Sequence, residues 1–492
     1  MSEFLSKYTI ESGPFVPTWE SLRGFETPEW FRDAKLGIWA HWGPQAVPMY
    51  GDWYARHMYC EGYPQYLHHW RTYGHPSEHG FKDVAKLWRA EKFDPEGLMD
   101  LYAKAGAKYF VAQAVHHDNF DNWDSAHNRW NATKVGPMRD IVGAWKQAAA
   151  RRSLRFGVSE HLAASFSWWV PNKGADKTGP YAGVPYDGND KQFRDFYHDN
   201  VGAAVVSDVM WRVEPWYTTD IRWHEHWFKR ITDLVAKYTP DLLYSDGPLP
   251  WDKVGLSVVA DLYNRSARAH GGTNQAVYTQ KDRDEKIFRI GVLDIERGQQ
   301  DDAVPRPWQT DTCTGGWFYD VRQVYKTPEH VIEMFVDIVA KNGNLLLNFP
   351  QRPDGTLDDE NREILRAMAA WMQVNGEGIY GTRPWTRAIE GPSRAASGHF
   401  KEDRVPWTTA DFRFTRKGNV VYAFQMRYPD NREAFIRALG LSAGAGKVAR
   451  VSVLGHDGKV FFRQLEDGLL VQLPEKKVCE LVPCMKVETI AG

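Results

Sequence analysis

The stretch HWFKRITDLVAKYTPDLLYSDGP (226–248) holds the pattern on which the fold depends. Residues 226–238 read as an amphipathic helix, and after a short turn the apolar run at 242–244 reads as a buried strand. This strand ends on a carboxylate, Asp246, which is followed by Gly and Pro. Taken alone, Asp246 would be a turn residue, because Asp-Gly is a common turn dipeptide. The rest of the chain favours a second interpretation.

The same unit, an amphipathic helix followed by an apolar run with polar residues at its end, recurs along the chain. Such alternation, with apolar strands, predicts a parallel sheet that is covered by helices on both faces. About eight strands are expected, in the runs 35–43, 108–118, 154–161, 241–248, 276–282, 288–298, 308–313 and 344–355. We therefore predict an α/β fold, a (β/α)8 TIM-like barrel, in which the active site lies at the C-terminal ends of the strands.

The pattern changes near residue 385. Beyond it, segments such as DFRFTRKGNVVYAFQM (411–426) alternate apolar and polar residues between Gly, Asn and Asp turns, which is typical of a β-sandwich. We predict a catalytic barrel at 1–385 and a C-terminal β-sandwich at 386–492. The barrel carries an aromatic-rich insertion at 162–222, and a loop of this length is usually functional. We expect it to form a lid or a wall of the substrate cleft.

Composition excludes some functions and favours others. The net charge of −2 gives no reason to expect nucleic acid or an anionic membrane as a partner. With 22 Trp, 22 Tyr and 24 Phe, the chain is rich in rings that pack against the apolar faces of sugars. The alternative is a large core that is filled by aromatic residues.

The four cysteines form neither a disulfide framework nor a zinc signature, so buried thiols are expected. The start MSEFLSKYTIES has no apolar h-region, which favours a cytoplasmic location over a periplasmic or secreted one. No apolar stretch is long enough to span a bilayer.

The predicted strand ends concentrate His, Asp and Glu beyond what turns require. Glycoside cleavage needs two carboxyl groups, one that attacks or activates water and one that protonates the leaving oxygen. Asp246 and Glu296 are the candidates. Histidines at strand ends would suit sugar hydroxyls, whereas a satisfied polar cluster at the barrel mouth is the alternative; they are His41, His116, His117 and His161.

A catalytic metal is the rival hypothesis for the run HHDNFDNWD (116–124). The run lacks a ligand spacing such as H-E-x-x-H. Adjacent histidines on a strand point to opposite faces, so one strand would not present His116 and His117 to one ion. We expect no metal and no other cofactor.

Four stretches resemble the glycoside hydrolase family 29 α-L-fucosidases. They are WFRDAKLGIWAHWGPQAVPMYGDWYARHM (30–58), KYFVAQAVHHDNFDNWDS (108–125), the strand that ends in SDG, and VDIVAKNGNLLLNFPQRPDGT (336–356). The resemblance covers roughly residues 17–385 and implies a catalytic barrel with a C-terminal β-sandwich. It also implies a retaining exo-glycosidase that needs no metal.

Carried over residue by residue, the resemblance assigns Asp246 as the nucleophile and Glu296 as the best match for the acid/base. His41, Trp53, His116 and His117 would bind the fucose hydroxyls and shape the pocket around its methyl group. We also expect His161 and Trp308, the first residue of WQTDTC, to contact the substrate.

The chain departs from the family pattern at four positions, which we also place in the substrate site. Asp52 stands where Glu is common, and Tyr244 stands where a pocket Trp is expected. Lys281 is the loose match for an Arg near the end of the fifth strand, and Glu160 replaces a Tyr after the third. Glu160 therefore competes with Glu296 as the acid, unless it pairs with His161 or a nearby basic residue.

These residues predict an exo-acting retaining α-L-fucosidase that acts on a fucosylated oligosaccharide or glycoconjugate. The sequence leaves the oligomeric state open, with a homo-oligomer as one possibility. Two alternatives stay open. One is a glycosidase of the same fold that acts on a related sugar such as a galactoside, and the other is a catalytically dead carbohydrate-binding protein. A metal-dependent hydrolase ranks below both.

Overall fold

The computed structural model describes residues 9–206 and 213–490. Eight parallel strands form one sheet in the order β8-β7-β6-β3-β2-β1-β10-β9. A parallel bridge between Asp294 and Gln309 joins the two edges, so the sheet closes into a barrel. Its strands are β1 (Leu36–Ala40), β2 (Tyr109–Val115), β3 (Arg155–Glu160), β6 (Leu242–Ser245), β7 (Val277–Gln280), β8 (Val292–Leu293), β9 (Trp308–Cys313) and β10 (Gly343–Asn348). The predicted barrel is confirmed.

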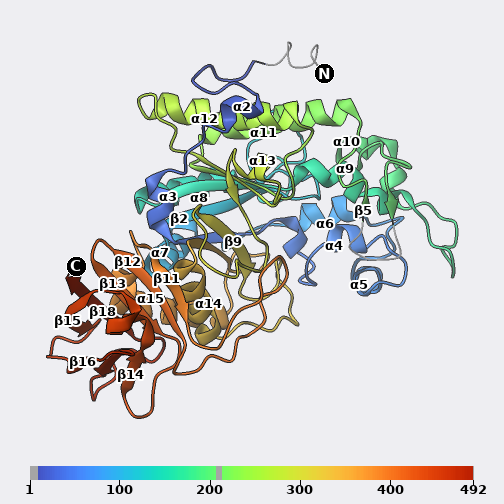
Figure 1. Ribbon diagram of the computed structural model, residues 1–492. Helices are drawn as coiled ribbons and strands as arrows, with labels where there is room; N and C mark the ends of the chain where they lie inside the picture. Colours follow the sequence, from blue (N-terminus) through green and yellow to red (C-terminus); the bar gives the residue numbers. More distant parts are fainter. Residues whose placement is uncertain (1–8, 207–212, 491–492) are drawn as a thin grey trace.

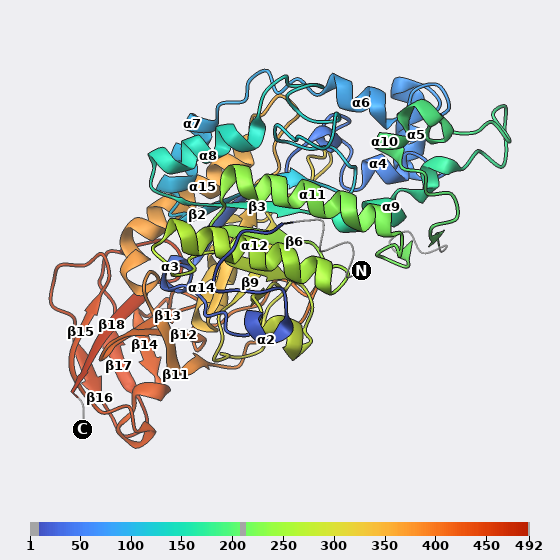
Figure 2. The same cartoon turned by 90° about the horizontal axis from the view of Figure 1, so that it is seen from above.

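Long helices cover the outside of the barrel (Figures 1 and 2). They are α7 (Pro95–Lys104), α8 (Ile141–Arg151), α11 (Ile221–Tyr238), α12 (Lys253–Ala269), α14 (Pro328–Ala340) and α15 (Asp359–Asn375). In α11, Asp220 caps the first turn through a hydrogen bond from Arg222 N, so the helix begins five residues before the predicted start at 226. Its apolar face buries residues at helical spacing, among them Trp227, Ile231 and Leu234.

The other described α-helices lie in the N-terminal segment and in the loops that follow β1, β3 and β7. They are α2 (Trp19–Leu22), α3 (Glu29–Ala34), α4 (Tyr54–His57), α5 (Pro64–Tyr73), α6 (Phe81–Leu87), α9 (Ser165–Trp168), α10 (Arg194–Tyr197) and α13 (Glu285–Phe288). The insertion at 162–222 contributes α9, α10 and a small hairpin of β4 (Val205–Val206) and β5 (Val213–Glu214). In Figure 1 this insertion lies beside α4, α5 and α6, at one end of the barrel.

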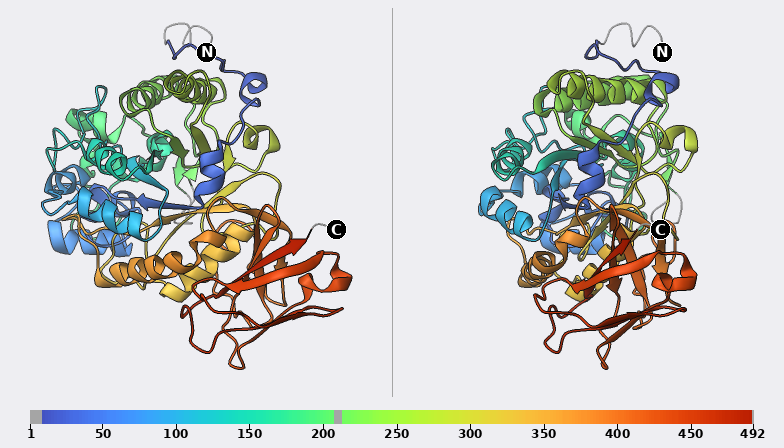
Figure 3. Two further views of the ribbon diagram at one scale, coloured as in Figure 1. Left: turned by 90° about the vertical axis from the view of Figure 1, so that its left-hand side faces the viewer. Right: turned by 60° about the vertical axis from the view of Figure 1, so that its left-hand side comes forward.

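The C-terminal part consists of two antiparallel sheets (Figure 3). One sheet holds β11 (Arg383–Glu390), β12 (Phe412–Lys417), β13 (Val420–Gln425), β18 (Cys484–Ile490) and β15 (Lys447–Val453). The other holds β14 (Glu433–Ile436), β17 (Leu469–Gln472) and β16 (Phe462–Gln464). Side chains of both sheets share one core. Since β11 already begins at Arg383, we propose the division between the two parts before this residue and not at 385.

A buried ion pair joins the two parts. Arg413 on β12 donates to Asp337 on α14, which also accepts a hydrogen bond of 2.9 Å from Lys341 Nζ. Arg413, Asp337 and Lys341 are all fully buried. Such charges are stable away from water only when they are paired. The barrel and the sandwich therefore meet through a charged contact as well as an apolar one.

Within the described residues, every helix is too short or too polar to cross a membrane.

Candidate active site

The closed barrel gathers polar side chains at the C-terminal ends of its strands. His41 follows β1, His116 and His117 follow β2, and Asp246 follows β6. Lys281 follows β7, and Glu296 lies on the loop after β8. In a parallel barrel these strand ends face one opening, which is why positions far apart in the sequence meet there.

Asp246 lies at the centre of the cluster. Its Oδ1 is 2.8 Å from Lys281 Nζ and 3.3 Å from the Tyr244 hydroxyl oxygen. Its Oδ2 is 3.3 Å from His117 Nε2 and 3.1 Å from His161 Nδ1. Burial alone would raise the pKa of Asp246, but Lys281 and the two histidines hold it well below its usual range. The Asp246 side chain is therefore a carboxylate at neutral pH.

Glu296 has the opposite character. Burial, together with the nearby charges of Asp311 and Asp246, raises its pKa to about 7, although Lys281 acts against this shift. Its Oε2 forms an ion pair with Lys281 Nζ. The two carboxyl groups thus meet at one ammonium group but differ in the pH at which each holds its proton. Divergent pKa values of this kind mark an acid and a nucleophile.

The shared contact also limits how far apart the two carboxyl groups can be. Lys281 Nζ contacts both Asp246 Oδ1 and Glu296 Oε2. The two oxygens therefore lie no more than about 6 Å apart, twice the length of a normal hydrogen bond. Retaining glycosidases separate their carboxyl groups by about 5–5.5 Å, and inverting enzymes by about 6.5–9.5 Å. The separation fits a retaining arrangement.

A second pair of carboxyl groups lies next to Lys281, and sequence reasoning missed it. Asp311 on β9 accepts a hydrogen bond of 2.9 Å from the Tyr244 hydroxyl and lies 3.7 Å from Lys281 Nζ. Asp294 is fully buried, and burial together with Asp311 raises its pKa well above the usual range. A protonated Asp294 beside Asp311 limits the negative charge around Lys281. Asp311 belongs to the run DTC, one of the polar strand ends, so its position was a signal that could have found it.

The histidines form a compact group with few partners of their own. His41 Nδ1 and His161 Nε2 are buried without a hydrogen-bond partner in the described part of the chain, whereas His161 Nδ1 faces Asp246. Burial, with other histidines nearby, lowers the pKa values of His41 and His116 well below their usual range, so both rings are neutral. A neutral imidazole offers one donor and one acceptor, which suits a sugar hydroxyl.

Two sets of these groups lie close enough to share an ion. One is His41, His116 and His161, and the other is His117, His161 and Asp246; in each, the ligand atoms lie within 4.8 Å of one another. Among the described residues neither set contains both His116 and His117, although both follow the end of β2 and their ring centroids lie 4.6 Å apart.

Aromatic rings line one side of the cluster. Trp53 packs edge-on against His117 at 6.0 Å and stacks with Trp216 of the insertion at 6.2 Å. Trp168, also from the insertion, lies 5.4 Å from the His117 ring. Thus the insertion forms a wall of the site, and Trp216 and Trp168 are residues that sequence reasoning did not single out. Asp52, next to Trp53, keeps Oδ1 buried without a partner among the described residues, and burial raises its pKa to about 7.

Two predicted site residues are engaged in other contacts. Glu160 is fully occupied, since its carboxylate accepts hydrogen bonds from Ser245 Oγ, from Trp227 Nε1 at 3.1 Å and from Leu162 N at 2.9 Å. These donors hold Glu160 on the strand edge, so it is poorly placed to compete with Glu296. Trp308 begins β9, at the end of the strand opposite to the site, and its Nε1 donates to Lys341 O at 2.9 Å. The expectation that Trp308 contacts the substrate is wrong.

Tyr244 is fully buried below Asp246, where its hydroxyl joins Asp246 to Asp311. We therefore regard it as a support of the nucleophile and not as a wall of the pocket.

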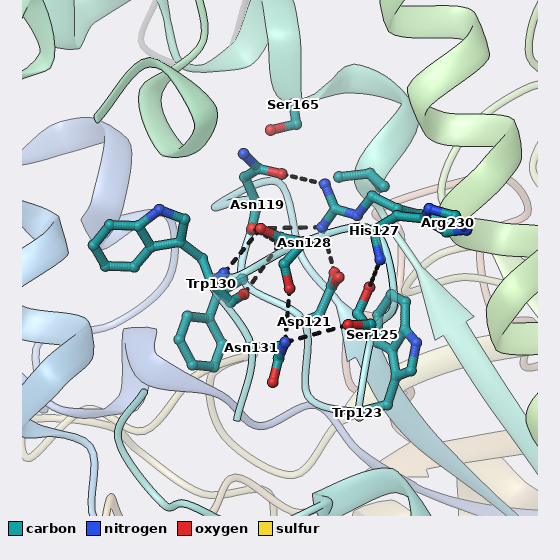
Figure 4. Close-up of polar contacts among 12 residues, drawn as sticks. Asn119, Asp121, Trp123, Ser125, His127, Asn128, Trp130, Asn131, Ser165 and Arg230 are labelled. Atoms are coloured by element: carbon teal, nitrogen blue, oxygen red, sulfur yellow. Dashed lines mark hydrogen bonds and ion pairs between the residues drawn. The ribbon is translucent and has the colours of Figure 1, made fainter. Parts of the chain in front are cut away.

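The loop that carries His116 and His117 is fixed by a buried cation. Arg230 on α11 donates to the Asn119 amide oxygen and forms an ion pair with Asp121 (Figure 4). Asn128 extends the network: its Nδ2 donates to Asn119 O at 3.0 Å, and its Oδ1 accepts from Trp130 N at 3.0 Å. Helix α11, which precedes the strand that leads to Asp246, thus also anchors the loop that carries His116 and His117.

We expect the change Arg230→Met to destabilise the protein by about 3–5 kcal/mol, because it leaves Asp121 buried without its cation. Thermal unfolding followed by circular dichroism measures the effect. The matched control is Arg129→Met on the same loop, whose ion pair with Asp195 is largely exposed. A similar loss in both variants would contradict the role of the buried pair.

A (β/α)8 barrel with two carboxyl groups of opposed pKa at its strand ends defines a glycoside hydrolase. The sequence profile of the alpha-L-fucosidase family matches residues 4–377, and that of the alpha-L-fucosidase C-terminal domain matches residues 406–488. The chain therefore belongs to the alpha-L-fucosidase family, and its enzyme activity is that of an α-L-fucosidase.

Individual relatives agree over nearly the full length. Tissue alpha-L-fucosidase of Bos taurus is 30% identical over 466 residues, which is 94% of this chain and 87% of the relative. The alpha-fucosidase of Thermotoga maritima in complex with fucose has a TM-score of 0.73 at 24% identity, over 96% of this chain and 100% of that one. A trapped covalent intermediate of an alpha-L-fucosidase from Bacteroides thetaiotaomicron has a TM-score of 0.64 at 18% identity, over 94% and 96%.

Proposed function

We propose that the chain releases terminal α-L-fucosyl residues by double displacement, with Asp246 as the nucleophile and Glu296 as the acid/base. The observation that carries this proposal is the contact of one ammonium group, Lys281 Nζ, with both carboxyl groups. It keeps the two contacting oxygens within about 6 Å, which is compatible with a retaining pair, and their pKa values lie on opposite sides of the usual range. The trapped covalent intermediate in a structure of the same fold is a further support.

In the first step an Asp246 oxygen bonds to the anomeric carbon as the bond from this carbon to the leaving oxygen breaks. Glu296 gives its proton to that oxygen, so the leaving group departs as a neutral alcohol. In the second step the Glu296 carboxylate takes a proton from water. The water oxygen bonds to the anomeric carbon, the bond to Asp246 breaks, and fucose is released.

Lys281 would serve both steps. Glu296 changes between its neutral and its charged form during the cycle, and Asp246 loses its charge when it bonds to the sugar. An ammonium group in contact with both offsets whichever charge is present. This role is consistent with its buried place between the two, where its carboxylate neighbours keep its pKa high against the effect of burial.

His41 Nδ1, His161 Nε2 and the Asp52 oxygen would bind the fucose hydroxyls, together with His116 and His117. The rings of Trp53 and Trp216 would lie against the apolar side of the sugar, and the fully buried Trp168 would support Trp53 from behind. Exo action on a terminal fucosyl residue is part of this proposal. The formation of a homo-oligomer stays open.

The deciding experiment is hydrolysis of 4-nitrophenyl α-L-fucoside followed by NMR. We expect α-L-fucose to form first and then to mutarotate, because two displacements at the anomeric carbon restore its configuration. Release of β-L-fucose first would overturn the double displacement. The control is 4-nitrophenyl α-L-galactoside, which differs from the fucoside only by a hydroxymethyl group in the place of the methyl group. A higher kcat/KM on the galactoside would move the substrate assignment to the related sugar.

A further inference from the structure

Residues 398–402 lie after the barrel in the sequence but against the loop of Glu296 in space. Their backbone pairs with this loop: Gly398 N donates to Gln299 O at 2.9 Å, Phe400 N to Glu296 O at 2.8 Å, and Lys401 N to Arg297 O at 2.8 Å. Gly398 also forms an isolated antiparallel bridge with Gln299, so the backbone of the segment is bonded to the loop at three positions. The segment lies outside both stretches that match the family profiles, 4–377 and 406–488.

His399 completes the contact with Glu296. Its Nδ1 accepts a hydrogen bond of 3.0 Å from Glu296 N. Together with Phe400 N, it binds both backbone polar groups of the residue that carries the acid. An imidazole accepts through Nδ1 only when that nitrogen is unprotonated. Burial, with Lys281 and Arg283 nearby, lowers the pKa of His399, which keeps the ring neutral.

Glu402 fastens the segment to the end of β9. Its carboxylate accepts from Arg297 Nε at 2.6 Å and from Lys326 Nζ at 3.0 Å, and it also accepts from the Thr312 hydroxyl. Lys326 Nζ in turn donates to Cys313 O at 2.6 Å. The segment is therefore anchored to the barrel on one side and to the acid/base loop on the other.

The backbone on both sides of this contact has an unusual conformation. Arg297, directly after Glu296, has φ 46°, and Phe400, directly after His399, has φ 56°. Residues with side chains seldom adopt positive φ, and where they do the surrounding structure holds them there, often at functional sites. Without the hydrogen bonds to the segment, the Glu296 loop would be free to relax.

We propose that His399 is a positioning residue for the acid/base: through its bond to Glu296 N it holds the Glu296 carboxyl where the leaving oxygen needs it. This inference rests on the proposed role of Glu296. His399 makes no contact with the reacting atoms, so its removal should weaken proton transfer and leave sugar binding and nucleophilic attack intact.

The test compares His399→Ala with His399→Asn on two α-L-fucosides. The asparagine amide oxygen can replace Nδ1 as the acceptor, whereas alanine cannot. One substrate is 2,4-dinitrophenyl fucoside, whose leaving group needs no proton; the other is a fucosyl disaccharide, whose sugar leaving group does. The parameter kcat/KM reports the first displacement, in which Glu296 acts as an acid.

For His399→Ala we expect a fall in kcat/KM of about 10–100-fold on the disaccharide, a part of what a general acid contributes. On the dinitrophenyl substrate the fall should be less than about threefold, because little proton transfer is needed there. Azide should raise kcat of this variant on the dinitrophenyl substrate, because azide attacks the glycosyl-enzyme without a general base. His399→Asn should stay within about threefold of the wild type on both substrates. A purely structural defect would instead lower kcat/KM equally on both substrates.

The control His456→Ala removes a histidine of the sandwich, far along the chain. It should leave kcat/KM unchanged on both substrates. Equal losses in His399→Asn and His399→Ala, or equal losses on both substrates, would overturn the inference. Failure of the proposed function looks different. In that case the loss of kcat/KM in Glu296→Ala would itself be independent of the leaving group. If instead the loss in Glu296→Ala depends on the leaving group while His399→Ala is unaffected, only the positioning role of His399 is refuted.

Discussion

The change Asp246→Ala should lower kcat/KM on 4-nitrophenyl α-L-fucoside by about four orders of magnitude, the scale found when a side chain that acts at the reacting centre is removed. Alanine cannot form the glycosyl-enzyme, and it leaves Lys281, His117 and His161 facing an empty space. Azide is small enough to enter this space and attack the anomeric carbon from the side of the lost carboxylate. We therefore expect azide to restore nitrophenol release and to yield β-L-fucosyl azide, which NMR identifies.

The matched control is Asp241→Ala, at the opposite end of the same strand. Asp241 pairs with Arg155 at 2.8 Å and accepts from Phe156 N at 2.9 Å, away from the site. Its removal should leave kcat/KM nearly unchanged. If Asp246→Ala kept its activity, or if azide yielded α-L-fucosyl azide, Asp246 would not be the nucleophile.

The second large effect is expected for Glu296→Ala. On a fucosyl disaccharide kcat/KM should fall by about 10²–10⁴-fold, the contribution of a general acid. On 2,4-dinitrophenyl fucoside the fall should be less than about tenfold, because its leaving group departs without a proton. Steady-state kinetics on the two substrates measures the contrast.

The pH profile gives an independent check on Glu296. As the acid, Glu296 must hold its proton, and its pKa is raised to about 7, so the activity of the wild type should be present below this pH and lost as the pH rises through it. Asp246 must be ionised, and its lowered pKa places the loss of activity at low pH well below the usual range for a carboxyl group. Glu296→Ala should lose the limb near pH 7. Glu160→Gln, the comparison variant, should keep it; loss of this limb in Glu160→Gln alone would move the acid to Glu160.

The fold and the nucleophile could be predicted from the sequence because both depend on local patterns. Each strand is an apolar run next to a helix, and the barrel places every strand end at one opening, so Asp246 and the histidines could be placed without coordinates. Trp308 was misplaced because a motif does not say which of its residues reaches the opening: WQTDTC runs the length of β9, and Asp311 lies near its C-terminal end.

The other features depend on contacts that no periodicity records. Glu160 lies at a strand end like Asp246, and only the three donors around it show that it is occupied. The pairing of residues 398–402 with the Glu296 loop joins positions about a hundred apart in the chain. In the sequence this segment is an irregular stretch between two regular regions, with nothing to indicate its partner.

The buried ion pair of Arg413 and Asp337, with Lys341, has a consequence for exchanging the barrel or the sandwich of this enzyme with that of a relative. A barrel cut free of its sandwich would present Asp337 and Lys341 to water without Arg413, and a foreign sandwich with an apolar residue at this position would bury Asp337 with only Lys341 to balance it. The two parts are thus not interchangeable modules. A chimaera built from this barrel must carry over Arg413, together with Trp407, whose ring lies 4.5 Å from its guanidinium.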